Sequence, residues 1–320
     1  MTKPSVSIIL LNWNGYADTI EALESLYQIN YPNYNVIVAD NNSTNDSIEK
    51  IKSYARGEIK VETEFTHFKS ENKPIKFTYI NENEFRDGID NTSDKDEKKL
   101  LLIQNNENYG FAKGNNIAID YTMKYDNPDY ILLLNNDTIV DPNFLDNMIN
   151  VAVNNPNIGI IGPKFYYYDY EGSHDTIWCI GSVVDLEHFP GHHSIMEEEK
   201  YDLTLDVIEC DWVSGAGLLI KKEAMPEGYL NTDFFFGCED VDLAVEVKNK
   251  GYKVVTVTNS IIWHKVGMSR HKRSSFKTEY NHIMTNLKFI KKHKSNFYLS
   301  LPKYSYQIIK LYLSAIKNKL

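Results

Sequence analysis

Four hydrophobic runs in the first half of the chain have the length of strands that are buried on both faces of a sheet. They are residues 5–11, 34–39, 100–103 and 130–134. Apolar residues at helical spacing follow the first two runs, at residues 18–29 and 47–54. Strands that alternate with helices predict a doubly wound α/β fold, with a mostly parallel sheet flanked by helices.

The second half of the chain continues this pattern less regularly. We expect helices at residues 144–154 and 240–250, and strands at residues 158–163, 212–220 and 254–264. Residues 166–210 carry no pattern that assigns them to an element. The polar segment 57–98 interrupts the alternation in the first half, and we interpret it as an insertion with one hairpin around residues 75–80.

The last part of the chain predicts a helical extension at residues 269–320, after a main domain at residues 1–268. In residues 297–320, lysines recur every seven positions and apolar side chains fill the opposite side, with Pro302 in the first helical turn. Such an amphipathic helix is typical of peripheral contact with a membrane. The same apolar surface would also pack on its own domain or form a homodimer.

Charge divides the chain into an acidic body and a basic tail. From His264 onward, thirteen Lys or Arg residues accompany a single acidic residue, which gives +12. The formal charge of the whole chain is −10, so residues 1–263 carry −22. This tail favours an anionic membrane surface as its partner. Nucleic acid is not expected, because the acidic body repels it and no recognition motif is present.

Composition fits a soluble globular protein, since 42% of the 320 residues are hydrophobic and 24% are charged. Three scattered cysteines favour a reduced compartment and buried thiols. We expect neither a signal peptide nor a membrane-spanning helix, because no apolar run reaches about 18 residues. The sequence therefore predicts a cytoplasmic protein, with its tail at the inner face of the membrane.

Candidate chemistry begins at the end of the fourth hydrophobic run, where Asn135, Asn136 and Asp137 follow three leucines. Ligands bind at such strand ends in open α/β sheets. Asn135 and Asp137 offer two hard oxygen ligands to one divalent cation. The alternative is an ordinary turn, in which Asn and Asp are common.

A second acidic pair, Glu239 and Asp240, opens a predicted helix, and His264 ends a predicted strand. Acidic residues at a helix start are favoured by the helix dipole in any protein, and a histidine at a strand end is equally ordinary. The functional interpretation makes Asp240 a general base and His264 a metal ligand through its neutral imidazole.

Asp40 ends the second hydrophobic run, where it either accepts a hydrogen bond from a ligand or simply forms a turn. The glycine-containing turn at residues 110–116 is suited to a phosphate or a sugar. It matches neither the dinucleotide fingerprint nor the phosphate-loop signature.

Together these segments resemble the family 2 inverting glycosyltransferases of the GT-A fold, and within them the rhamnosyltransferase-like subgroup. The matching segments are residues 6–15, 38–43, 108–116, 133–137, 211–216 and 236–243, followed by His264 and Gly267. The resemblance covers about residues 5–295. One departure is that the metal motif begins with Asn135 rather than Asp, which predicts that the metal arrives with the nucleotide diphosphate.

The resemblance implies a nucleotide-diphosphate sugar as the donor, with Asp40 on its pyrimidine base. The other donor-binding residues that it implies are Leu11, Asn12, Trp13, Asn42, Asn108, Gly110, Lys113, Asn116, Asn135 and Asn136. It also implies that Asp137, His264 and Asn135 hold Mg²⁺ or Mn²⁺, which neutralises the leaving diphosphate.

On the acceptor side, the resemblance implies Asp240 as the catalytic base, oriented by Glu239, with Trp212, Gly215 and Ala216 beside the acceptor. The implied reaction moves a sugar from dTDP-rhamnose or a UDP-sugar, with inversion, to a hydroxyl of a surface glycan or a lipid-linked acceptor.

Two other functions would use the same class of ligand. A sugar-nucleotide nucleotidyltransferase usually has a glycine-rich loop with a basic residue after its first strand, which residues 12–15 lack. A non-catalytic nucleotide-sugar-binding protein has no need of Asp137, Asp240 and His264 together.

Overall fold

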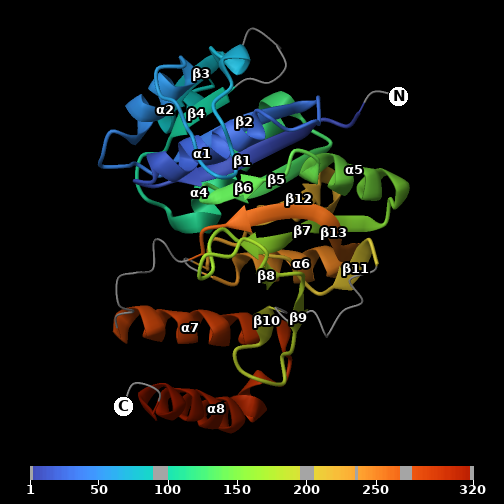
Figure 1. Cartoon of the computed structure of the whole chain (residues 1–320). Helices are drawn as coiled ribbons and strands as arrows, with labels where there is room; N and C mark the ends of the chain where they lie inside the picture. Colours follow the sequence, from blue (N-terminus) through green and yellow to red (C-terminus); the bar gives the residue numbers. More distant parts are fainter. Residues whose placement is uncertain (1–2, 89–99, 195–204, 235–236, 267–275, 318–320) are drawn as a thin grey trace.

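The hydrophobic runs of the first half form the parallel part of a central sheet (Figure 1). The structure is a computed structural model that describes residues 3–88, 100–194, 205–234, 237–266 and 276–317. The parallel strands lie in the order β3-β4-β2-β1-β5. Their bounds are β1 Val6–Asn12, β2 Tyr34–Asp40, β3 Phe77–Asn81, β4 Leu100–Gln104 and β5 Tyr130–Asn135.

Antiparallel strands enter the sheet in the second half of the chain. β12 lies between β5 and β7 and is antiparallel to both, whereas β13 runs parallel to β7. Short strands β6, β8 and β11 add antiparallel pairs at β13 and β7, and β9 pairs with β10 in a separate hairpin. The bounds are β6 Thr138–Val140, β7 Ile158–Tyr167, β8 Ile177–Cys179, β9 Ser182–Val184, β10 His192–Ser194, β11 Val207–Cys210, β12 Gly217–Lys221 and β13 Lys253–His264.

Helices cover both faces of the sheet, as the α/β pattern predicts. Side chains alternate across each strand, so Ile8 and Leu10 enter a core with α1, α2 and α5, while Ile9 enters a second core with α4 and α6. The helices are α1 Tyr16–Leu26, α2 Ser47–Ala55, α3 Glu82–Arg86, α4 Gly110–Tyr121, α5 Phe144–Asn154, α6 Glu239–Asn249, α7 Phe276–His293 and α8 Phe297–Lys317.

The expected strand at residues 212–220 is shorter than its apolar pattern indicates. It begins only at Gly217, and residues 212–216 form a connection beside the site described below. Conversely, the strand expected at 158–163 extends to Tyr167, because β13 pairs with it along its whole length.

The hairpin expected around residues 75–80 is wrong. β3 instead lies at the edge of the central sheet, parallel to β4, and the capping box of Asn81 and Glu84 then starts α3. Earlier in the insertion, the ring of Phe65 lies 4.9 Å from that of Trp263 on β13. The insertion therefore braces the strand that ends at His264. Residues 89–98 of this segment lie outside the described residues.

The C-terminal helices α7 and α8 lie side by side beneath α6, and β10 lies next to α7 (Figure 1). Phe289, Ile290, Phe297 and Tyr304 are buried in the second core. Residues 269–275, before α7, lie outside the described residues. Among the described helices, none has the length and apolarity that a membrane crossing requires.

The expected lysine pattern of the tail is only partly described. Lys303 and Lys310 are exposed, but Ile309 beside them is exposed as well, and the side chain of Lys317 lies outside the described residues. Pro302 lies inside α8 rather than in its first turn, because the helix already begins at Phe297.

Candidate active site

A cavity of about 360 Å³ lies where β5 and β13 end and α6 begins. Many of the residues that the sequence predicts for chemistry line it. They are Asn135, Asp137, Gly215, Ala216, Glu239, Asp240 and His264. The carboxyl ends of strands that are far apart in sequence meet here, as expected for an open α/β sheet.

Asn135, Asp137 and His264 form one cluster on the wall of this cavity. Nε2 of His264 lies 3.1 Å from Oδ1 of Asp137 and 3.5 Å from the side-chain nitrogen of Asn135. Burial raises the pKa of the Asp137 carboxyl, but the hydrogen bond and charge of His264 outweigh burial and hold that pKa below its usual value. A rotated Asn135 amide would present its oxygen at the same point.

The donor set of this cluster fits a divalent cation. Carboxylate and amide oxygens are ligands that Mg²⁺ and Mn²⁺ prefer, and a neutral imidazole is a common ligand of divalent metals in proteins. Within the described part of the chain, Nδ1 of His264 is buried and has no hydrogen-bond partner. Among the described residues, the hydrogen-bonding contacts of the imidazole therefore lie on its Nε2 side, toward Asp137 and Asn135.

Asp240 lies at the start of α6 and is fixed by backbone groups. Its Oδ2 accepts the Gly215 N–H at 2.8 Å, and its Oδ1 accepts the Val241 N–H at 2.9 Å. Burial raises the pKa of Asp240, and the Gly215 N–H opposes that rise. The connection before β12 thus points this carboxylate into the cavity.

Glu239, the neighbour of Asp240, is 8% exposed, and its Oε2 has no hydrogen-bond partner among the described residues. Burial, and then the charge of Asp240, raise the pKa of Glu239 to about 8. Because Asp240 holds the backbone donors, we assign the negative charge of the pair to Asp240 near neutral pH and the proton to Glu239.

Cys238, which precedes this pair, connects α6 to two other elements. It has a left-handed φ of 71°. Its Sγ lies 3.3 Å from Nε2 of His192 on β10 and 3.3 Å from Oδ1 of Asn286 on α7. Burial lowers the pKa of His192, which keeps that ring neutral. β10 and α7 therefore both hold the start of α6 in place.

Asp40 lies away from this cavity, in a turn between the ends of β1 and β2. It is fully buried, and its Oδ2 accepts from Asn12 at 2.5 Å and from the Ser43 hydroxyl at 2.6 Å. Its Oδ1 accepts the Ser43 N–H at 2.8 Å. In this structure Asp40 forms a turn, which is the alternative that the sequence left open.

Trp13 lies on the neighbouring turn and is 56% exposed. Leu11 is partly buried at the end of β1. Asn42 donates to the Asn106 carbonyl at 3.1 Å, and Asn136 donates to the Thr19 hydroxyl at 3.0 Å. The exposed indole is the group on this turn that is free to meet a ligand.

The predicted donor residues on α4 have mixed environments. Gly110 has a left-handed φ of 74°, and its N–H is accepted by the Asn108 side chain at 3.1 Å. Lys113 is exposed. Asn116 instead binds both backbone groups of Leu230, at 2.8 and 3.0 Å, which fastens α4 to the connection before α6.

Trp212 is buried and is not among the residues that line the cavity, and its indole N–H is donated to the Val183 carbonyl at 3.3 Å. Sequence reasoning missed several residues that do line the cavity, namely Phe111, Trp178, Gly237, Val266 and His282. The ring of Trp178 lies 4.6 Å from that of His264. Trp178 belongs to the segment that no pattern assigned, whereas Phe111 and Gly237 lie inside motifs that were recognised.

A second group of potential metal ligands lies further along α6, where Asp242, Glu246 and His293 approach one another. The ammonium of Lys292 contacts both oxygens of Asp242 at 2.8 Å and lies 3.0 Å from Glu246. The ammonium of Lys292 therefore already occupies the position between these two carboxylates that a metal ion would take.

Two family descriptions match nearly the whole chain. "Glycosyltransferase like family 2" matches residues 75–283, and "Glycosyl transferase family 2" matches residues 7–73. Among curated proteins, the chain is 24% identical over 204 residues to the uncharacterized protein y4gI of Sinorhizobium fredii (strain NBRC 101917 / NGR234). That match covers 58% of this chain but only 21% of the relative, so the chain spans about a fifth of its length.

Solved glycosyltransferase structures share the fold. The mannosyltransferase PcManGT of Pyrobaculum calidifontis, in complex with GDP-Man and Mn²⁺, has a TM-score of 0.56 at 15% identity, covering 91% of this chain and 65% of its own. GalNAc-T7 with UDP, GalNAc and Mn²⁺ has a TM-score of 0.55 at 13% identity, covering 89% and 48%. TarS 1–349 of S. aureus has a TM-score of 0.50 at 13% identity, covering 88% and 65%.

Three observations agree on the family and the fold. They are the cavity at the strand ends, the match to the family over most of the chain, and the likeness to these structures. The chain belongs to the family 2 glycosyltransferases and has the GT-A fold.

Proposed function

We propose that the protein transfers a sugar, with inversion, from a nucleotide-diphosphate donor to a hydroxyl of a surface-glycan or lipid-linked acceptor. The observation that carries this proposal is the placement of a fixed carboxylate, Asp240, and of the Asn135, Asp137 and His264 cluster on the walls of one cavity. A rhamnosyltransferase-like donor preference, for dTDP-rhamnose or a UDP-sugar, remains part of the proposal.

Asp240 takes the proton of the acceptor hydroxyl in this mechanism. Its two oxygens accept backbone N–H groups at 2.8 and 2.9 Å, so the carboxylate is already oriented before the acceptor arrives. Its raised pKa makes it a stronger base than an exposed aspartate. The deprotonated hydroxyl attacks the anomeric carbon from the side opposite the diphosphate, which inverts the configuration in one displacement.

Asp137, His264 and Asn135 would hold Mg²⁺ or Mn²⁺ on the donor side. When bound, the ion neutralises the charge that develops on the departing diphosphate. Asp137 is the single carboxylate among these three residues, so they form a weakly charged site. We therefore propose that the ion binds together with the nucleotide diphosphate.

Trp13 would stack on the base of the donor. Its indole is 56% exposed on a turn that the Asp40 network holds rigid. Stacking of a base on an aromatic side chain contributes about 1–3 kcal/mol. The backbone of this turn, rather than the saturated Asp40 carboxylate, would then give the base its hydrogen bonds.

Thermal stabilisation by UDP, dTDP, GDP and ADP, each with Mn²⁺ and with chelator, tests the donor site. We expect UDP or dTDP to raise the melting temperature only when Mn²⁺ is present. Asp137→Ala should abolish the part of the shift that depends on Mn²⁺, because it removes the charged ligand of the cluster.

Asp242→Ala is the matched control for that variant, because it removes the carboxylate that Lys292 already neutralises. It should retain the Mn²⁺-dependent shift. If Asp242→Ala loses the shift and Asp137→Ala keeps it, the metal belongs to the second acidic group. No shift with any nucleotide would contradict the proposed function.

A further inference from the structure

Large apolar side chains gather on the surface of the C-terminal helices α7 and α8. Among the described residues, ten large hydrophobic side chains are exposed, and six of them belong to these two helices. Four lie on α8, with exposed fractions between 58% and 84%, namely Tyr298, Leu299, Tyr306 and Ile309. Single exposed apolar residues are ordinary, but a group of them on one short segment indicates a binding surface.

α8 is apolar on two different sides. Phe297 and Tyr304 are buried on the side that packs into the second core. A second row of residues recurs every three or four positions and is exposed throughout, namely Tyr298, Pro302, Tyr306 and Ile309. Successive residues of a helix are turned by about 100°, so this second row, the outer stripe, lies on another side than the buried row.

Lysines accompany the outer stripe. Lys303 and Lys310 are exposed on the neighbouring row of α8. No acidic residue follows Glu279 in the sequence, so α8 has no carboxylate of its own to neutralise them. Glu187, whose pKa Lys303 helps to lower, is already paired with Lys294 at 2.7 Å. The exposed surface of α8 is therefore both apolar and positively charged.

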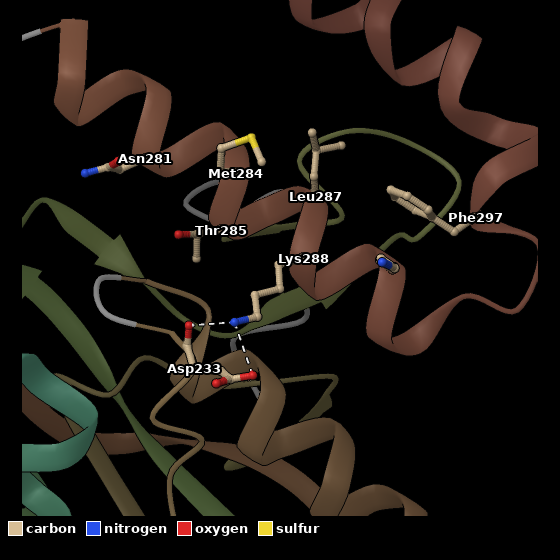
Figure 2. Close-up of a pocket in the computed structure, with 8 residues that line it drawn as sticks. Asp233, Asn281, Met284, Thr285, Leu287, Lys288 and Phe297 are labelled. Atoms are coloured by element: carbon tan, nitrogen blue, oxygen red, sulfur yellow. Dashed lines mark hydrogen bonds and ion pairs between the residues drawn. The ribbon is translucent and has the colours of Figure 1, made fainter.

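The lysines of α7 differ in how well acidic groups neutralise them. Lys288 lies 3.1 Å from the carboxylate of Asp233 (Figure 2), and Lys292 is paired with two carboxylates of α6. Lys291 has no acidic partner among the described residues, and its ammonium lies 5.6 Å from the centre of the Tyr298 ring. This cation of α7 therefore belongs to the same surface as the outer stripe.

A cavity of about 630 Å³ adjoins the outer stripe at Tyr298. Lys291 lines this cavity, and its apolar wall consists of Met284 and Leu287 from α7 with Phe297 from α8 (Figure 2). The surface between the two helices is therefore hollowed and apolar at the place where Lys291 contacts Tyr298. Such a surface is suited to flexible hydrocarbon chains with anionic groups beside them.

The place of α8 in the molecule separates this surface from the acidic part of the chain. Figure 1 shows α8 at the end of the molecule opposite to α2 and β3. Residues 1–263 carry a formal charge of −22. Exposed charges more than about 10 Å apart are largely screened at physiological salt concentration. An anionic surface can therefore approach α8 without strong repulsion from most of the acidic body.

A second copy of the chain is a poorer occupant of this surface than a lipid bilayer. A two-fold contact between outer stripes would bring the lysines of both copies together, and α8 offers no acidic residue to pair with them. At a bilayer surface, by contrast, tyrosines lie at the level of the headgroups and lysines extend to the phosphates.

We propose that the outer stripe of α8 docks the protein on a bilayer surface that contains anionic lipids. The helix lies in the plane of the surface, and the apolar side chains of the outer stripe enter the headgroup region together with Leu299. Lys291, Lys303 and Lys310 bind lipid phosphates. This inference goes beyond the proposed function and does not depend on it.

Flotation with lipid vesicles tests the docking without any turnover. We expect the full chain to bind phosphatidylcholine vesicles with about one third phosphatidylglycerol at least tenfold more tightly than pure phosphatidylcholine vesicles, because each lysine near an anionic surface strengthens binding about fivefold. Lys303→Gln combined with Lys310→Gln should weaken binding to the anionic vesicles about thirtyfold. Equal binding of the two vesicle types, or no binding to either, would overturn the proposal.

The apolar part of the contact is tested by Leu299→Asp combined with Tyr306→Asp, which should weaken binding to anionic vesicles about tenfold or more. Val153→Asp combined with Tyr170→Asp is the matched control, because it makes the same change at two exposed apolar residues outside α7 and α8. The control should bind like the wild type. Equal binding by the two double variants would show that the outer stripe makes no contact of its own.

A fluorescent label identifies the side of the molecule that meets the bilayer. The three native cysteines are buried, so a polarity-sensitive fluorophore can be attached to one introduced thiol, in Tyr306→Cys or in Val153→Cys. We expect anionic vesicles to shift the emission to shorter wavelength at position 306 alone. The same response at both positions, or no shift at position 306, would contradict docking through α8.

Light scattering in solution distinguishes the bilayer from a second copy. A wild-type dimer that Leu299→Asp combined with Tyr306→Asp dissociates, without vesicle binding by the wild type, would assign the outer stripe to a second copy and overturn the proposal. If no nucleotide stabilises the protein while vesicle binding through α8 persists, the proposed function fails and the docking surface stands.

Discussion

The turn at the ends of β1 and β2 and the cavity at the ends of β5 and β13 differ in how completely their buried polar atoms are paired. In the turn, both oxygens of Asp40 accept hydrogen bonds from the protein. In the cavity, Oε2 of Glu239 and Nδ1 of His264 are buried without a partner in the described part of the chain. An unpaired buried polar atom costs about 1–3 kcal/mol. The paired region therefore contributes rigidity, and under the proposed function the unpaired atoms would be available to a bound ligand.

The strongest test of this contrast is Asp240→Asn in the cavity. The amide keeps the shape of the side chain but removes the base, so the transfer rate should fall about 10²–10⁴-fold. Stabilisation by the donor nucleotide should remain. Initial rates with a nucleotide-sugar panel measure the first effect, and thermal shifts measure the second. Turnover close to that of the wild type would exclude Asp240 as the base.

The second test compares aspartates from the two regions by urea unfolding in the presence of chelator. Asp40→Ala leaves donors of Asn12 and Ser43 unpaired in a fully buried turn, so it should reduce the free energy of unfolding by about 3–5 kcal/mol. Asp137→Ala removes one hydrogen bond to His264 and should cost about 1 kcal/mol. Equal losses would show that the two regions are built alike.

The third test uses the proton of Glu239. Its pKa is raised from 4.5 to about 8, so the folded protein binds more protons than the unfolded chain between these values. The contribution of Glu239 to the free energy of unfolding should therefore be largest below about pH 4.5, and it should decrease as the pH rises toward 8. Glu239→Gln should remove this decrease, which makes the variant more stable than the wild type at pH 8 by about 4 kcal/mol. The free energy of unfolding of both proteins should be measured across this pH range. If it changes with pH equally in the wild type and in Glu239→Gln, the assignment of the proton to Glu239 is wrong.

The fold could be predicted where strands are buried on both faces, because burial leaves such strands almost purely apolar. β1, β2, β4 and β5 were recognised in this way. β3 was not, because it is an edge strand with one exposed side and shows no continuous run. Its position depends on pairing with β4, which local pattern does not encode.

The sequence predicted those residues of the candidate site that lie at the ends of strands and helices. Asn135, Asp137 and His264 follow apolar runs, and the structure gathers them in one cavity. Trp178 and His282 were missed, because tertiary packing rather than periodicity brings an unassigned segment and the C-terminal helix to the cavity. Asp40 had the expected position, but its pairing with Asn12 depends on contacts that the sequence does not display.

The burial of Phe289 and Ile290 in the core that also contains β1 and α4 has a consequence for the evolution of this enzyme. Gly191 lies so close to Ile290 that an added Cβ would come within 2.7 Å of its side chain. At this contact, a bulkier residue in the β9–β10 hairpin requires a matching change in α7. An evolutionary exchange of the C-terminal helices alone would disturb the interior of the domain, because their side chains are part of it.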